Sequence, residues 1–203
     1  MDSAVSLVQT YLRVNGYFTV TEYPLVEIRG EDARTLTDLD VLAFRFPGAG
    51  RPARGRRGQT GGPCAPADPV LGCPEDRPDM LIGEVKEGRA QWNAAGSRPE
   101  VIAAGLTRFG CCSPGHAHHI AEAVLRDGEA TTHDGHMVRL VVFSGHGGSG
   151  GPYRVVHLGH VLDYLLDFLQ EEWPALGHTE LKDPTLGLLA TLARTHPRHP
   201  GQR

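Results

Sequence analysis

The chain has 203 residues, of which 40% are hydrophobic and 22% are charged. This balance suits a single globular domain with a sizeable core, and it excludes a disordered polypeptide or a coiled coil. The formal net charge of −4 gives no overall positive field of the kind that marks many nucleic-acid-binding proteins.

The sequence carries no signal for secretion or for a membrane. No apolar run is long enough to cross a bilayer, and the first residues lack the basic start and cleavage site of a signal peptide. Four cysteines in a chain of this length do not suggest a disulfide framework. We therefore expect a cytoplasmic protein that has no membrane partner.

Hydrophobic spacing predicts the elements of the first half of the chain. A helical pattern covers residues 3–15. A strand rich in β-branched and aromatic residues follows over 17–27, and we expect Pro24 to break it. A second strand is predicted over 35–46 and a third over 80–86.

The second half is predicted to contain both helices and strands. In chain order these are helices over 100–109 and 117–126, strands over 137–143 and 153–158, and helices over 160–173 and 185–193. The glycine-rich stretch 145–151 is expected to be a hairpin turn. This order predicts one α/β domain over residues 1–195, with a mixed β-sheet flanked by helices. Residues 196–203 are expected to form a disordered tail.

A long loop over residues 47–78 separates the second and third predicted strands. Its first part, 47–63, holds six glycines, three prolines and no acid, together with four arginines, Arg51, Arg54, Arg56 and Arg57. That composition predicts a flexible basic loop. Two interpretations stay open: the arginines follow a phosphate backbone, or the loop is a solvated insertion.

Charged residues interrupt two strands that are otherwise mostly apolar. Side chains alternate along a strand with period two, so Asp38 and Asp40 share one face, and Glu84 and Lys86 share another. Burying any of these charges alone is costly, so the arrangement requires pairing, a metal ion or exposure at the end of the sheet. An ordinary ion pair on a solvated strand face is the simplest alternative.

Carboxylates from neighbouring strands form a hard, oxygen-rich site that suits Mg²⁺ or Mn²⁺. Such an ion lowers the pKa of a bound water and stabilises charge on a phosphoryl oxygen. A nearby lysine can orient that water or balance the developing charge. Asp40, Glu84 and Lys86 are therefore the minimum set of residues for a metal-dependent site that hydrolyses a phosphodiester.

The leading helix, the segment Asp40-Val-Leu-Ala and a strand ending Glu84-Val85-Lys86 resemble the PD-(D/E)xK nuclease superfamily. The resemblance covers the first half of the chain by motif and the rest by element order. It implies a restriction-endonuclease-like fold with an αβββαβ core, and a Mg²⁺- or Mn²⁺-dependent endonuclease that acts on DNA, with a homodimer as a possible assembly. By the same resemblance Asp40, Glu84 and the carbonyl of Val85 hold the metal, and Lys86 is the catalytic lysine.

The resemblance also implies supporting residues. Some members carry a glutamine on the helix after the lysine, and Gln91 falls at that place. Many have a further acid on the first helix or strand, for which Glu22 is the nearest candidate and Glu27 the next. Asp38 is a second supporting residue. The proline of the family's name is absent before Asp40.

Two other functions stay open. The first is a catalytically inactive member of the same fold that serves as a nucleic-acid-binding or assembly module. The second is an interaction protein that binds a metal through the Cys/His segment 111–119, which contains Cys111, Cys112, His116, His118 and His119. Its spacing lacks the two separated pairs of a zinc finger, which favours buried cysteines followed by an exposed helix start.

Overall fold

The computed structural model describes residues 2–29, 32–50, 66–148, 150–176 and 182–195. The helices are α1 (Ser3–Val14), α2 (Pro99–Arg108), α3 (Pro114–Asp127), α4 (Leu158–Leu176) and α5 (Pro184–Thr195), with a short 3-10 helix, η1, at Pro69–Leu71. The strands are β1 (Phe18–Arg29), β2 (Asp32–Arg45), β3 (Asp79–Arg89), β4 (Glu129–Thr131), β5 (Met137–His146) and β6 (Arg154–His157). None of the helices in these ranges combines the length and apolar character needed to cross a membrane.

The strands form one mixed, open sheet in the order β1-β2-β3-β5-β4, and β6 also pairs with β5. The first three strands are antiparallel neighbours, whereas β5 lies parallel to β3. The parallel pair requires a crossover, which α2 and α3 supply. The predicted α/β class with a mixed, helix-flanked sheet is confirmed.

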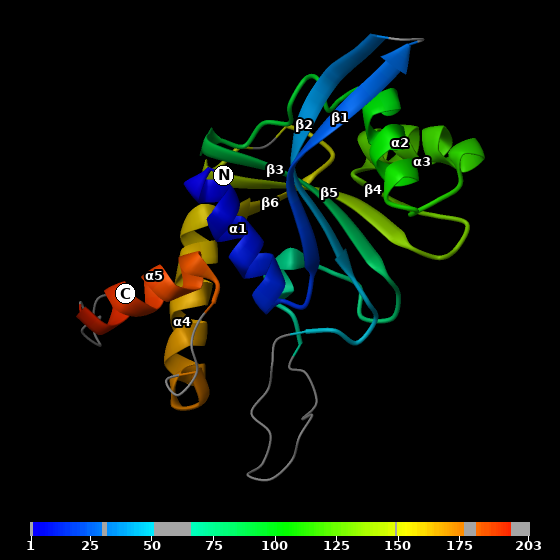
Figure 1. Ribbon diagram of the computed structural model, residues 1–203. Coiled ribbons are helices and arrows are strands. Elements are labelled where there is room, and N and C mark those ends of the chain that lie inside the picture. The colour runs from blue at the N-terminus through cyan, green and yellow to red at the C-terminus, as the bar shows by residue number, and fades with distance from the viewer. Residues whose placement is uncertain (1, 30–31, 51–65, 149, 177–181, 196–203) are drawn as a thin grey trace.

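Helices cover both faces of the sheet (Figure 1). Val41, Leu81 and Phe143 pack in a cluster with α1, α4 and α5. Met80 and Ile82 point the other way, into a second cluster with α2 and α3. Since side chains alternate along β3, the residues that follow on the α2/α3 face are Glu84 and Lys86.

Local sequence explains where the helices start and stop. The Asp2 carboxylate caps α1 by accepting a 2.7 Å hydrogen bond from the Ala4 backbone N–H. Proline opens α2 and α3, at Pro99 and Pro114, where a missing N–H costs nothing. Gly128 ends α3 with φ of 83°, a left-handed conformation that glycine adopts without strain.

The predicted break at Pro24 is wrong. Strand β1 runs through it, and Pro24 pairs with Asp38 of β2. Proline is tolerated because β1 is an edge strand. The irregularities lie beside it instead: the register shifts between Leu25 and Val26, and Glu22 has φ of 51°.

The hairpin turn predicted for 145–151 is also wrong. Strands β5 and β6 are parallel, with Val141 opposite Arg154 and Ser144 opposite His157, so the connection returns to the start of β6. The three-residue strand β4, which pairs antiparallel with β5, was not predicted because it is too short to show alternation.

A buried polar network joins α1, η1 and α4. The Asp68 carboxylate accepts a 2.7 Å hydrogen bond from the Tyr11 hydroxyl, and Nε2 of His160 lies 2.6 Å from it. The backbone N–H of Val70 donates to its other oxygen. Burial acts to raise the pKa of Asp68, but these hydrogen bonds outweigh burial and hold it below its usual range.

Stability is therefore expected to fall in acid. A carboxyl whose pKa is lower in the folded state stabilises the protein above its unfolded pKa, and this stabilisation is lost as the pH falls through the folded value. Asp68→Asn should lower the free energy of unfolding at pH 7 by about 1.5–3 kcal/mol. Urea unfolding from pH 7 to pH 3 should then show a smaller loss in the variant than in wild type. Equal slopes below pH 4 would contradict this assignment.

Candidate metal-binding site on strands β2 and β3

The site lies where β2 and β3 begin to separate. The last paired residues are Val41 and Gly83. One step further in the same register, Asp40 lies opposite Glu84, so the two carboxylates are cross-strand neighbours. The sequence predicted that both residues belong to one site, and the antiparallel register brings them together.

Glu84 is a buried carboxylate, with 4% of its surface exposed. The register sets Val142 of β5 on its other side, and this apolar neighbour helps to exclude water. Burial raises the pKa of Glu84, and the nearby Asp40 charge raises it further, while the hydrogen bond from Lys86 acts in the opposite direction. The carboxylate therefore sits in surroundings that favour a cationic partner.

Lys86 supplies that partner. Its Nζ lies 2.5 Å from Oε1 of Glu84. The lysine side chain is 38% exposed, so the pair joins a buried anion to a cation at the surface. The predicted same-face arrangement of Glu84 and Lys86 is confirmed by this contact.

Asp40 is held by the backbone of β3. The N–H of Val85 donates a 2.8 Å hydrogen bond to Oδ2 of Asp40. The backbone pairing of β2 with β3 ends at Gly83. The Asp40 carboxylate therefore accepts the hydrogen bond that a backbone carbonyl of β2 would accept if the pairing continued. This bond fixes the Asp40 side chain on the β3 side, next to Glu84.

These donors suit a hard divalent cation. Two carboxylates and the carbonyl of Val85 are oxygen ligands of the type that Mg²⁺ and Mn²⁺ prefer. The charge of Asp40 acts unfavourably on Glu84, and a cation bound between them relieves that repulsion. The pair is smaller than an all-protein cage: within the described ranges, no three His, Cys, Asp or Glu side chains lie close enough together to hold a metal ion. Mg²⁺ usually keeps several waters, so two carboxylates and a carbonyl fit it.

The remaining predicted residues do not join the site. Gln91 is exposed and lies in the coil between β3 and α2, so the predicted helical position is wrong. Glu22 is level with Asp40, between the pairs Thr21–Val41 and Tyr23–Leu39, but its φ of 51° interrupts the alternation, and its Oε1 accepts a hydrogen bond from the backbone N–H of Asp2. Asp38 is exposed, beyond the end of the β2–β3 ladder. The side chain of Glu27 lies outside the described residues.

One of the two interpretations of the basic loop set its arginines along a phosphate backbone beside the site. Its arginines, Arg51, Arg54, Arg56 and Arg57, fall outside the described residues. The described residues just before them lie at the other end of β3: the Arg45 guanidinium donates a hydrogen bond to the carbonyl of Ala49, and Arg45 pairs with Asp79. Asp79 is five residues before Glu84 along β3, which is about 16 Å. The arginine contact with a substrate stays a prediction.

The structure places Ser144 and the glycine-rich loop after it beside the end of β3, a position that the sequence did not predict. Ser144 of β5 lies opposite Lys86 and is fully buried. The loop after it packs closely on the end of β3, with no room for a side chain at two glycines. A Cβ atom added to Gly148 would lie 2.7 Å from the carbonyl oxygen of Ala90, and a Cβ atom added to Gly145 would overlap the carbonyl oxygen of Glu87. The signal for this loop was its glycine content, which reflects close backbone approach instead of a hairpin.

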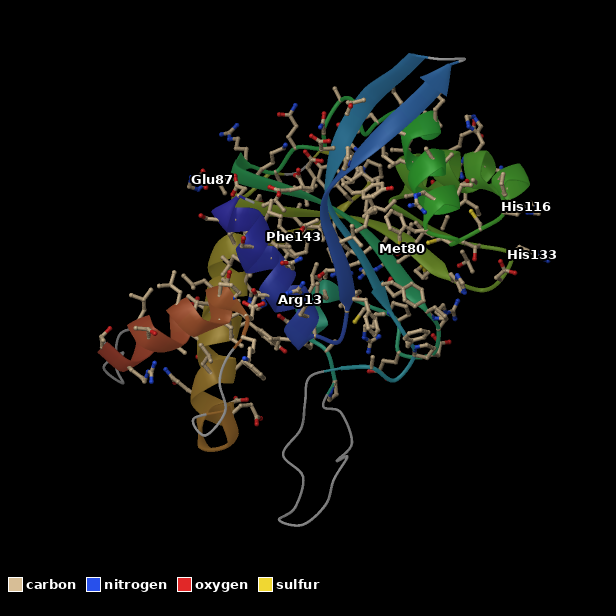
Figure 2. All side chains as sticks on the ribbon, in the orientation of Figure 1. Arg13, Met80, Glu87, His116, His133 and Phe143 are labelled. Carbon is tan, nitrogen blue, oxygen red and sulfur yellow. The ribbon has the colours of Figure 1, made fainter. Side chains whose placement is uncertain are left out.

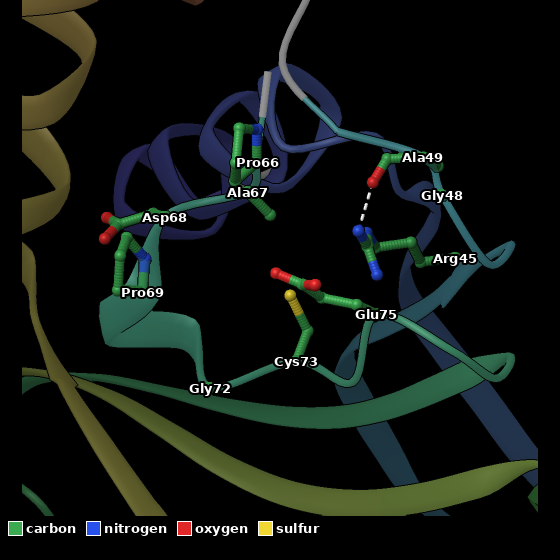
Figure 3. Close-up of a pocket in the computed structure, with 10 residues that line it drawn as sticks. All are labelled: Arg45, Gly48, Ala49, Pro66, Ala67, Asp68, Pro69, Gly72, Cys73 and Glu75. Atoms are coloured by element: carbon green, nitrogen blue, oxygen red, sulfur yellow. Dashed lines mark hydrogen bonds between the residues drawn. The ribbon is translucent and has the colours of Figure 1, made fainter. Parts of the chain in front are cut away.

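One cavity lies away from the candidate site. A cavity of about 430 Å³ opens between residues 45–49 and 66–75. Arg45, Cys73 and Glu75 point into it, whereas the Asp68 carboxylate turns away (Figure 3). Arg45 pairs with Asp79 at the start of β3, so this cavity and the candidate site are at opposite ends of the strand pair. At the candidate site Glu84 is buried, whereas the side chain of Lys86 is 38% exposed.

The Cys/His segment does not gather around a point. Cys111 and Cys112 are buried in the α2/α3 cluster. His118 lies on the exposed side of α3, 3.4 Å from Glu122. His116 stacks on His133 at the outer edge of the domain, with ring centroids 5.9 Å apart (Figure 2). The described residues therefore bring no zinc-binding set together here.

Thiol reactivity should distinguish the cysteines. Burial raises the pKa of Cys111 to about 11 and also raises the pKa of Cys112, whereas Cys73 is only half-buried. The thiolate is the form that reacts, so Cys73 should react faster than the two buried cysteines. A Cys64→Ser variant, which leaves these three cysteines, should show one fast-reacting thiol with Ellman's reagent at pH 7.5 and three after unfolding. Adding Cys73→Ser should remove the fast phase. A fast phase that survives this change would contradict the assignment.

Comparisons of this chain with protein-family models, with curated proteins and with solved structures found no match. The site must therefore be interpreted from its own geometry and chemistry.

Proposed function

We propose that this chain is a metal-dependent nuclease that hydrolyses phosphodiester bonds of DNA. The observation that carries the proposal is the placement of Asp40 opposite Glu84, with the ammonium of Lys86 on the Glu84 carboxylate. A buried carboxylate, a second carboxylate and a surface lysine form one cluster on two adjacent strands.

The order of elements supports a restriction-endonuclease-like core of the PD-(D/E)xK type. Helix α1 precedes three antiparallel strands, β1 to β3, and helices α2 and α3 then lead to β5, which lies parallel to β3. This is the αβββαβ order that the sequence resemblance implies. The motif residues lie on the second and third strands of that order.

In this proposal Asp40, Glu84 and the carbonyl of Val85 hold Mg²⁺ or Mn²⁺. When bound, the ion supplies Lewis acidity toward a phosphate oxygen and toward the attacking water. Lys86 is exposed enough to face a substrate phosphate and to balance its negative charge. The Val85 N–H keeps the Asp40 carboxylate oriented toward Glu84.

The surroundings of the site favour a polymer over a small phosphodiester. The end of β3 beyond Glu84 faces solvent: Lys86 is 38% exposed, and the two residues after it, Glu87 and Gly88, are exposed. A small substrate is normally enclosed in a pocket, whereas an extended duplex can reach an open surface. Arg89 is exposed three residues beyond Lys86 and offers a second contact for a phosphate backbone.

The test is cleavage of supercoiled plasmid, a branched DNA oligonucleotide and an RNA of matched length, each with Mg²⁺ or Mn²⁺. Cleavage of a DNA substrate that EDTA abolishes is the expected result. Cleavage of the RNA but of neither DNA would mean that the substrate is RNA instead of DNA. If the protein binds DNA without cleaving it under any metal, the nuclease proposal fails and a nucleic-acid-binding module replaces it.

A further inference from the structure

Lys86 and a divalent cation need the same carboxylate. The ammonium lies 2.5 Å from Oε1 of Glu84, whose side chain is only 5% exposed. A cation bound between Asp40 and Glu84 would bring a second positive charge next to this ammonium. Two like charges at that separation repel strongly in a partly desolvated site, so the ammonium must move when the cation binds.

Ser144 is a buried hydroxyl that has no hydrogen-bond partner among the described residues. It is fully buried, and its Oγ is one of four such unpartnered side-chain atoms. Leaving a buried hydroxyl unpaired is costly, and such a group calls for a specific explanation. The register sets Ser144 directly beside Lys86 on the same face of the sheet.

We propose that Ser144 is a positioning residue that accepts the Lys86 ammonium when a divalent cation occupies Glu84. Lys86 then alternates between two acceptors, Glu84 without the cation and Ser144 with it. This inference rests on the metal site of the proposed function and adds to it the residue that holds the lysine in the metal-loaded state.

Both acceptors are within reach of one lysine side chain. Glu84 lies two residues back along β3, about 6.6 Å away, and Ser144 lies one strand over, about 4.8 Å away. The four-carbon stem of lysine spans either distance. Two histidines compete as neighbours of Ser144: His157 lies opposite it on β6, and His146 is two residues further along β5.

Metal affinity separates these roles. Mn²⁺ binding would be measured by electron paramagnetic resonance on wild type, Ser144→Ala, Lys86→Met and the double variant. We expect Lys86→Met to bind Mn²⁺ about 10-fold more tightly, and Ser144→Ala about 10-fold more weakly. In the Lys86→Met background, Ser144→Ala should have no effect, because the ammonium it serves is gone. His157→Gln is the matched control and should leave the affinity unchanged.

A second measurement follows the lysine itself. Lys86 and Lys182 are the two lysines of the chain, so protein labelled with ¹³C at the lysine Cε gives two Cε signals. Adding Mg²⁺ should shift the Lys86 Cε signal and leave Lys182 unchanged. The shifted position should differ between wild type and Ser144→Ala, while the metal-free positions agree.

The outcomes are distinguishable. If Mn²⁺ binds but Ser144→Ala has the same affinity as wild type, or weakens binding equally with and without Lys86, the proposal is overturned and the metal site stands. If neither Mn²⁺ nor Mg²⁺ binds the wild type, and Glu84→Gln gives the same absence of binding, the metal site of the proposed function fails, and the role of Ser144 fails with it.

Discussion

Glu84→Gln is expected to reduce the rate of DNA cleavage by about 100-fold or more, whereas Glu87→Gln should leave it unchanged. Glutamine keeps the size of Glu84 but removes the charge that pairs with Lys86 and would hold the metal. Glu87 is an exposed acid on the same strand, three residues further along, so it controls for a general loss of negative charge.

The measurement is a single-turnover rate on whichever DNA substrate the wild type cleaves, with circular dichroism to show that both variants are folded. The single-turnover rate of Lys86→Met should fall as that of Glu84→Gln does, if the ammonium faces the reacting phosphate. A Glu84→Gln rate within about threefold of wild type would show that the carboxylate does not hold the metal.

The second large effect concerns stability. Asp79→Ala is expected to lower the free energy of unfolding by about 3–5 kcal/mol, because it leaves the buried Arg139 guanidinium without its partner. Asp79 is completely buried, and Arg139 is 4% exposed. Two hydrogen bonds of 2.7 and 2.9 Å join the guanidinium to the carboxylate, and the Tyr17 hydroxyl donates a third.

Urea unfolding followed by tryptophan fluorescence measures this change. Arg139→Met should be similarly costly, since it leaves the buried Asp79 unpaired except for Tyr17. The double variant Asp79→Leu/Arg139→Met should recover part of the loss, because it removes both charges. A single Asp79→Ala loss below about 1 kcal/mol would mean that water reaches the pair.

Burial of this network also changes its ionisation. Burial raises the pKa of Tyr17, and the adjacent Asp79 charge raises it further. For Arg139, burial disfavours the charged form, but the bonds to Asp79 outweigh it and the pKa is raised. Tyr17 therefore stays neutral and the Arg139 guanidinium stays charged at neutral pH. The network ties the end of α1 to β3 and β5, at the opposite end of β3 from the candidate site.

Local pattern was sufficient for much of the fold. The helix expected over 3–15 matches α1, and the strand expected over 80–86 lies within β3. The Glu84–Lys86 contact also follows from local sequence, because period-two alternation sets both side chains on one face whatever the strand pairs with. Pro24 failed as a break because its effect depends on strand position: only the sheet order shows that β1 is an edge.

The same limit applies to the site. The sequence by itself determined that Asp40, Glu84 and Lys86 are charges set in apolar strands, and that an acidic pair with a lysine suits a divalent cation. Only the tertiary structure decided that Asp40 lies opposite Glu84, that Ser144 lies beside Lys86, and that Gln91 falls away from both. The physical reason is that alternation acts over two residues, whereas register joins positions 44 to 58 residues apart and is selected by the packing of the whole sheet.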